Sequence, residues 1–101
     1  MNEADSGPPH YKVVYSGLVR EELKQLLYRT RDQHRGAQTL RAIKELDRRL
    51  RIYPQFGEEL QDLQMEGQTR WIATVPPFVV DYIIDEINRM VFIIVPLKML
   101  Q

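Results

Sequence analysis

Residues 70–86 read RWIATVPPFVVDYIIDE, and this stretch decides the fold. Two runs rich in β-branched and aromatic residues, at 69–75 and 78–85, flank the pair Pro76-Pro77. Both runs have the length and composition of β-strands, and a proline pair interrupts a strand because proline has no N–H to donate. The stretch therefore predicts two neighbouring strands joined by a short turn.

Further strands are predicted on either side of this pair. The run at 59–65 (ELQDLQM) follows Gly57 and is a weak strand, with a turn at Gly67, and the run at 90–95 (MVFIIV) is a stronger one. The 90–95 run is apolar at every position, which is typical of a strand covered on both faces. The second half of the chain is expected to form an antiparallel meander of three or four strands.

The first half of the chain has a different periodicity. A short strand is predicted at 11–15 (YKVVY), and helices are predicted at 17–32 and 38–52, with Ser16 as the cap of the first helix and Gly36 in or near the turn that ends it. The apolar residues at helical spacing are Val19, Leu23, Leu26 and Leu27, then Leu40, Ile43, Leu46 and Leu50. A short polar link favours an antiparallel helix hairpin.

The order of elements predicts an α+β domain over residues 11–101, with the helix hairpin on one face of a mostly antiparallel sheet and residues 1–10 as a flexible tail. The 101 residues include no cysteine, which excludes disulfides, thiolate catalysis and cysteine-bound zinc. Residues 1–10 lack the pattern of a signal peptide, and the longest apolar stretch is too short to span a membrane. We therefore expect a cytoplasmic protein with no membrane partner.

Charge is balanced over the whole chain but not along it. The chain has 14 Lys+Arg and 14 Asp+Glu, yet residues 17–51 carry a net charge of +5 and residues 52–101 a net charge of −4. Arg41, Lys44, Arg48 and Arg51 are spaced by three and four positions, so they share one stripe of the second helix. This basic stripe is a candidate site for an anion or a nucleic acid, and the alternative is an ordinary solvated helix face.

The inventory of chemical groups gives little support for catalysis. His10 and His34 have no metal-ligand spacing, and the acidic pairs consist of sequence neighbours that point in different directions. Ser16 is needed as a cap, and the five glycines do not form a phosphate-binding loop. No metal and no cofactor is expected.

A resemblance to a known family rests on two stretches, LRIYPQFGEELQDL at 50–63 and RWIATVPPFVVDYIIDE at 70–86. Together with the element order, they resemble the RelE/ParE superfamily of type II toxin–antitoxin toxins, a group that includes plasmid-stabilisation proteins. The family pattern has a strand like W-R-I-R-V, a short turn, and a strand like Y-R-V-I-Y-E-I-D. The residues of this chain that fall on that pattern are Trp71, Val75, Phe78, Val80, Tyr82, Ile84 and Asp85. The resemblance implies the RelE/ParE fold.

The positions that carry activity in this family differ here. RelE-like toxins cleave ribosome-bound mRNA with arginines and lysines around the sheet, which stabilise phosphate charge and move protons. In this chain Ile72 and Thr74 stand where W-R-I-R-V has its arginines, and Val79 stands at the arginine of Y-R-V. Lys98 alone matches a terminal basic residue, and it is the one candidate catalytic residue. We therefore expect little or no mRNA cleavage.

The resemblance leaves three functions open. The first is a toxin-like component of a toxin–antitoxin system that acts by binding, as ParE-like members do on DNA gyrase. The second is a non-toxic interaction or dimerisation module of the same fold, and the third is an active ribosome-dependent mRNA interferase that uses Lys98. The implied partners are a cognate antitoxin or a second copy of the chain, and the implied targets are RNA, the ribosome or a gyrase-like protein.

Strand alternation separates two faces of the predicted sheet. The face under the helices carries Trp71, Ala73, Val75, Phe78, Val80, Tyr82 and Ile84. The opposite face carries Arg70, Ile72, Thr74, Val79, Asp81 and Ile83. A monomer rarely leaves such an apolar face in water, so we expect a partner interface at Ile72, Thr74, Val79 and Ile83. The alternative is that the tail or the C-terminal residues fold over it.

Overall fold

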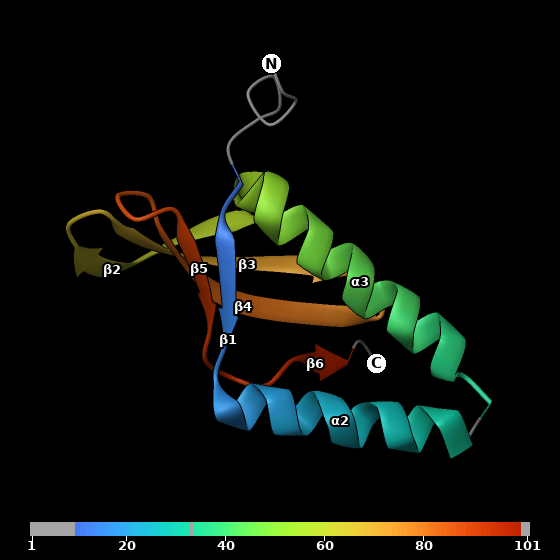
Figure 1. Ribbon diagram of the computed structural model, residues 1–101. Helices are drawn as coiled ribbons and strands as arrows, with labels where there is room; N and C mark the ends of the chain where they lie inside the picture. Colours follow the sequence, from blue (N-terminus) through green and yellow to red (C-terminus); the bar gives the residue numbers. More distant parts are fainter. Residues whose placement is uncertain (1–9, 33, 100–101) are drawn as a thin grey trace.

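A strand, two helices and a meander of strands follow one another in the computed structural model (Figure 1). The structure describes residues 10–32 and 34–99, with the backbone alone at 62–64, so the tail predicted at residues 1–10 lies almost wholly outside the described residues. The elements are β1 (Lys12–Tyr15), α2 (Gly17–Asp32), α3 (Gly36–Ile52), the 3₁₀ turn η1 (Pro54–Phe56), β2 (Glu58–Met65), β3 (Gln68–Val75), β4 (Phe78–Asp85), β5 (Met90–Ile93) and β6 (Lys98–Met99). The predicted α+β class and element order are confirmed.

The strands form one mixed sheet in the order β1-β5-β4-β3-β2. β3 and β4 pair antiparallel over their full length, with Trp71 opposite Tyr82, and β2 pairs antiparallel with β3. β5 pairs antiparallel with the C-terminal half of β4, and β1 adds to β5 in the parallel direction, with Val13 opposite Val91. The predicted antiparallel meander is therefore confirmed, and the single parallel pair brings the N-terminal strand to the edge of the sheet.

The strand predicted at 90–95 is shorter than expected. β5 ends at Ile93, and its residues alternate between half-buried and buried. Ile94 and Val95 are 53% and 44% exposed. The chain leaves the sheet here because Pro96 follows, and a proline cannot donate a hydrogen bond to a neighbouring strand.

Residues 94–97 link β5 to a further short strand, β6, which was not predicted. β6 pairs antiparallel with the N-terminal half of β4, with Val79 opposite Lys98 and Phe78 opposite Met99. β5 and β6 thus cover different parts of the same edge of β4. The side chains of Leu97 and Met99 pack against the small buried cluster of Leu26, Ala42 and Phe78.

The helices lie on one side of the sheet and diverge from their link like the arms of a V (Figure 1). Ser16 caps α2 as predicted, because its Oγ accepts a hydrogen bond from the Val19 N–H at 3.2 Å. Near the other end of α2, the buried Thr30 hydroxyl donates to the Leu26 carbonyl at 3.0 Å. Among the described residues, neither helix is long and apolar enough to cross a membrane.

The buried side of α3 is not formed by all of the residues that the apolar spacing predicted. α3 begins at Gly36, so this glycine starts the second helix instead of ending the first. Thr39 and Ala42 are buried, whereas Leu40, expected in the core, is 41% exposed. Ala42 packs with Leu26 of α2, and small residues on this side of α3 allow the two helices to approach closely near their link.

The core lies between the helices and one face of the sheet. The buried sheet residues are Ala73, Val75, Phe78, Val80, Tyr82 and Ile84, together with Val13, Val91 and Ile93. Leu46 and Leu50 of α3 pack on them, and half-buried Trp71 lies at the margin of the cluster. The predicted helix-covered face is confirmed, with Trp71 less buried than its neighbours.

Candidate functional site

The face of the sheet opposite the helices, here called the open face, is the candidate site. Residues that stand opposite one another on antiparallel strands point to the same face, so the strand register determines which residues lie on the open face. It carries Arg70, Ile72 and Thr74 from β3, Val79, Asp81 and Ile83 from β4, and Phe92 from β5. Ile72, Val79 and Ile83 are half-buried and Thr74 is exposed. The four residues predicted as a partner interface therefore lie together on the open face.

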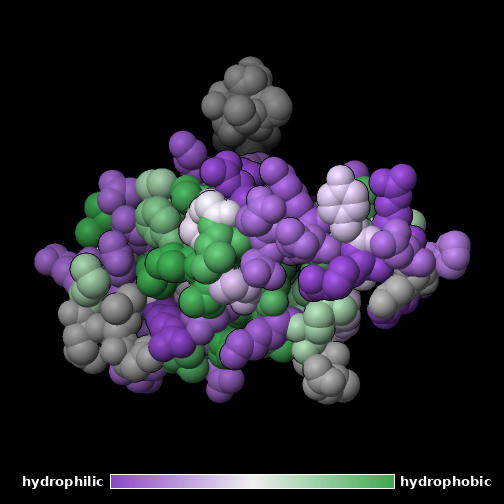
Figure 2. All heavy atoms as spheres, turned by 90° about the horizontal axis from the view of Figure 1, so that it is seen from below, coloured by the Kyte–Doolittle hydropathy of each residue, from purple (hydrophilic) through white to green (hydrophobic). Residues whose placement is uncertain are grey.

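The lower side of the molecule, which Figure 2 shows, is unevenly polar. Figure 2 looks at the molecule from below, and it shows apolar side chains gathered left of centre, toward the lower ends of β1 and β5. Hydrophilic side chains dominate to the right, on the side of the helix link. The apolar surface therefore belongs to the strand side of the molecule.

An ion pair stands in the middle of the open face. The Arg70 Nε and Nη2 groups donate to the two Asp81 carboxylate oxygens at 3.0 and 2.6 Å. The two residues are diagonal neighbours, because Arg70 stands opposite Ile83 and Asp81 opposite Ile72. The side chains are 38% and 29% exposed, so solvent screens the pair and its contribution to stability is at most about 1 kcal/mol.

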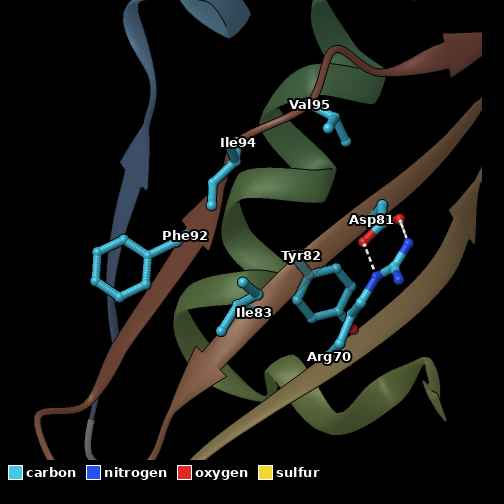
Figure 3. Close-up of a pocket in the computed structure, with 7 residues that line it drawn as sticks. All are labelled: Arg70, Asp81, Tyr82, Ile83, Phe92, Ile94 and Val95. Atoms are coloured by element: carbon cyan, nitrogen blue, oxygen red, sulfur yellow. Dashed lines mark hydrogen bonds and ion pairs between the residues drawn. The ribbon is translucent and has the colours of Figure 1, made fainter. Parts of the chain in front are cut away.

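Two hollows flank the ion pair, and Figure 3 shows the residues that line the first of them. One has a volume of about 190 Å³, and Ile83, Phe92, Ile94 and Val95 are among its lining residues. The other has a volume of about 280 Å³ and is lined by Ile72, Val79, Val95, Pro96 and Lys98 with the ion pair. Both are smaller than the roughly 300–1,000 Å³ of small-molecule pockets, so their size suits individual side chains.

Lys98, the predicted catalytic residue, lies at the edge of the larger hollow. β6 holds it opposite Val79 and therefore on the open face. Its side chain is exposed, and none of the described acidic residues forms an ion pair with it. Lys98 therefore supplies a positive charge beside an apolar surface.

The open face offers few groups for acid–base chemistry. The positions where the family resemblance implies arginines, Ile72, Thr74 and Val79, all lie on this face and carry no charge. His10 and His34 are exposed and do not line either hollow. In the described part of the chain, no three histidine, cysteine, aspartate or glutamate residues gather as metal ligands. The chemistry of the face is therefore that of an apolar surface with one ion pair and one lysine.

The predicted basic stripe lies on α3, away from the open face. Arg41, Lys44 and Arg48 are exposed and Arg51 is half-buried. Two of these four cations have acidic partners in the same helix: Arg48 pairs with Glu45 at 2.7 Å, and Arg51 pairs with Asp47 at 2.6 Å. These ion pairs leave the stripe less positive than the sequence pattern indicates.

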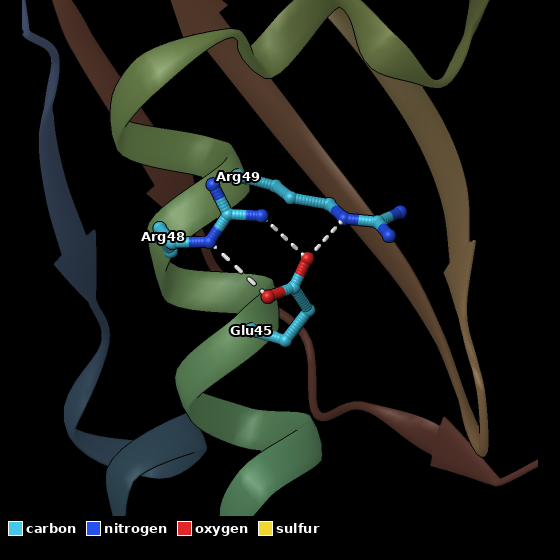
Figure 4. A network of polar contacts seen from close by, with 3 residues as sticks. All are labelled: Glu45, Arg48 and Arg49. Atoms are coloured by element: carbon cyan, nitrogen blue, oxygen red, sulfur yellow. Dashed lines mark hydrogen bonds and ion pairs between the residues drawn. The ribbon is translucent and has the colours of Figure 1, made fainter.

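Glu45 accepts hydrogen bonds from two arginines of the same helix, Arg48 and Arg49 (Figure 4). Hydrogen bonds from Arg48 and Arg49 lower the pKa of the Glu45 carboxyl to about 2. Asp47 accepts a hydrogen bond from the Tyr15 hydroxyl at 2.6 Å as well as one from Arg51. Burial, followed by the bond to Asp47, raises the pKa of Tyr15. Asp47 thus ties the stripe to β1, which is a structural role.

Sequence reasoning missed two features of the open face. It assigned Arg70 and Asp81 to this face without pairing them, and it did not foresee that residues 94–96 leave the sheet and form a wall beside the hollows. The signal for the ion pair was present: Arg70 lies six residues before Pro76 and Asp81 lies four residues after Pro77, and this offset of two makes opposite charges diagonal neighbours on one face. For the wall formed by residues 94–96, the only indication in the sequence was Pro96.

Comparison with known proteins gives no relative. No family model, no curated protein and no solved structure matches the chain.

Proposed function

We propose that this chain is a RelE/ParE-like, toxin-like component of a toxin–antitoxin system, and that it acts by binding. In this proposal the open face binds the partner chain, a cognate antitoxin. The observation that carries the proposal is that helices cover one face of the sheet, whereas the other presents half-buried Ile72, Val79 and Ile83 to solvent. Apolar surface of this kind is typical of a protein–protein interface.

Binding is favoured over catalysis because uncharged residues stand on the open face where the family pattern has arginines. Cleavage of RNA at the 2′-hydroxyl develops negative charge on a phosphate, and loss of one donor to such a charge typically costs about 100-fold or more in rate. Ile72, Thr74 and Val79 cannot supply that donor. The proposal therefore predicts no specific cleavage of ribosome-bound mRNA by the purified chain.

The test of the proposal is controlled expression. Inducing the chain in a bacterium is expected to arrest growth, and co-expression of the product of a neighbouring antitoxin-like reading frame is expected to restore growth and to form a complex with the chain. The matched variant is Val79→Asp, which places a charge on the open face and leaves the helix-covered core intact. It is expected to weaken the complex. Normal growth on induction would instead favour a non-toxic interaction or dimerisation module.

One observation favours a second candidate function. Lys98 lies on the open face beside Val79, where a phosphate of bound RNA would be within reach of its ammonium group. A ribosome-dependent interferase that uses Lys98 is therefore the alternative. If the purified chain cleaves ribosome-bound message and Lys98→Ala abolishes the cleavage, this alternative replaces the proposal.

A further inference from the structure

One side of α2 carries three cations, Arg20, Lys24 and Arg31. All three side chains are exposed, and their spacings of four and seven residues place them along the same side of the helix. None of them forms an ion pair with an acidic side chain that the structure describes. The positive charge of this side is therefore available to an anionic partner.

An aromatic ring stands among these cations. Tyr28 is 67% exposed, although a ring of this size usually buries most of its surface. It follows Lys24 by four residues and precedes Arg31 by three, so one cation lies on each side of the ring along the helix axis. The ring offers a face for stacking, and the cations offer charge on both sides of it.

The ring and the two cations next to it border a hollow. Lys24, Leu27, Tyr28 and Arg31 line this hollow, whose volume is about 400 Å³. It is larger than either hollow of the open face and within the roughly 300–1,000 Å³ of small-molecule pockets. The described residues that line it all belong to α2, and none of them is acidic. The hollow therefore suits a ligand that combines a flat ring with negative charge.

A nucleotide within a single strand has this combination. Any base can stack on an aromatic side chain, and lysine and arginine contact the backbone phosphates. A free nucleotide fits less well, because a hollow lined by one helix leaves much of it in water, whereas small-molecule sites bury about 70–90% of their ligand. A strand extends beyond the hollow and adds contacts, for which Arg20 is available one turn from Lys24.

The basic stripe of α3 is the competing surface for an anion. Two of its four cations, Arg48 and Arg51, already have carboxylate partners in their own helix. The two helices diverge from their link (Figure 1), so substitutions on α2 and on α3 test the two surfaces separately.

We propose that this side of α2 binds single-stranded nucleic acid, with one base stacked on Tyr28 and with Lys24 and Arg31 in contact with the phosphates on either side of that base. The inference goes beyond the proposed function, because the open face contributes nothing to this surface.

The experiment measures the fluorescence anisotropy of a labelled single-stranded oligothymidine as the full-length chain is added at several salt concentrations. Tyr28→Ala should lower affinity by about fivefold or more and leave the salt dependence unchanged. Arg31→Gln should lower affinity and reduce the slope of log K against log salt by about 0.7. Tyr28→Phe keeps the ring and should bind like the wild type. Arg29→Gln, which removes an exposed cation of α2 that does not line the hollow, is the matched control and should also bind like the wild type.

A second probe separates stacking from charge. An abasic oligonucleotide has the same phosphates without bases, so it should bind the wild type more weakly than oligothymidine does and should bind Tyr28→Ala equally weakly. Because the substituted side chains are exposed, the thermal unfolding of each variant should match that of the wild type.

Several results would overturn the inference. The first group is no binding at low salt, no effect of Tyr28→Ala, or equal losses in Arg29→Gln and Arg31→Gln. A larger loss in Arg41→Gln than in Arg31→Gln would move the site to α3. Competition by thymidine monophosphate as strong as that by the strand would indicate a free-nucleotide site, and equally strong competition by polyglutamate would indicate an acidic protein segment.

Discussion

The two faces of the sheet differ in how far their side chains are buried, although the same strands supply the residues of both faces. On the helix-covered face Phe78, Val80 and Tyr82 are fully buried, and the Tyr82 hydroxyl donates to the Pro54 carbonyl. On the open face, Val79 and Asp81 alternate with them and keep contact with solvent. The covered face therefore determines the stability of the free chain, and the open face is available for binding.

The largest effect expected from this comparison is the replacement of Tyr82. Tyr82→Ala removes a fully buried ring that stacks on Phe56, and it should cost about 3–5 kcal/mol of the free energy of unfolding. Val79→Ala, on the open face of the same strand, should cost about 1 kcal/mol or less. Urea unfolding of both variants measures the difference. Equal losses would show that the open face is as important to the free chain as the core.

A second, smaller effect concerns Gly57, where the chain enters β2. A Cβ at this position would lie 2.5 Å from the Ile72 carbonyl oxygen and 2.8 Å from the Ala73 Cβ. Gly57→Ala should therefore destabilise the chain by about 1–3 kcal/mol through overpacking. Gly17→Ala is the matched control, because a Cβ there meets nothing within 4 Å, and it should change stability by no more than about 1 kcal/mol. Thermal unfolding of the pair gives the comparison, and a neutral Gly57→Ala would contradict it.

The sequence was most informative where one face of a strand is buried. The period of two in β4 gave its bounds, 78–85, and its covered side, because a shift of one residue would move every apolar side chain into solvent. In α3 the pattern misled, since Leu40 is apolar but exposed and Thr39 takes the buried position near α2. β6 has two residues, too few to show any period, and its position depends on the free edge of β4. The candidate site follows the same division: its β3 and β4 residues were predicted, and its wall was not.

Asp85 and Asp81 provide a finer comparison, because both belong to the open side of β4 but have different partners. Asp85 accepts hydrogen bonds from the backbone N–H and the side-chain amide of Asn88, at 3.0 and 2.9 Å, and these bonds lower the pKa of its carboxyl. The stability that this carboxylate contributes is thus present above the ordinary aspartate pKa of about 3.9, and it is lost as pH falls through the lower folded value. Wild-type protein should lose more stability between pH 6 and pH 3 than Asp85→Asn does. Equal losses would show that the turn does not depend on the charge.

The smallest effect is expected at the Arg70–Asp81 pair in the free chain. Both side chains are partly exposed, so the Coulombic gain is screened and is offset by the entropy lost in holding two long groups in one geometry. Because Arg70 has a further contact, single substitutions mix several effects, and a double-mutant cycle of Arg70→Gln and Asp81→Asn is needed to isolate the coupling. That coupling should be about 0.2–1 kcal/mol in urea unfolding and should decrease with added salt. A coupling above about 2 kcal/mol would mean that the pair is shielded from water in the free chain, and the open face would then need a covering segment before any partner arrives.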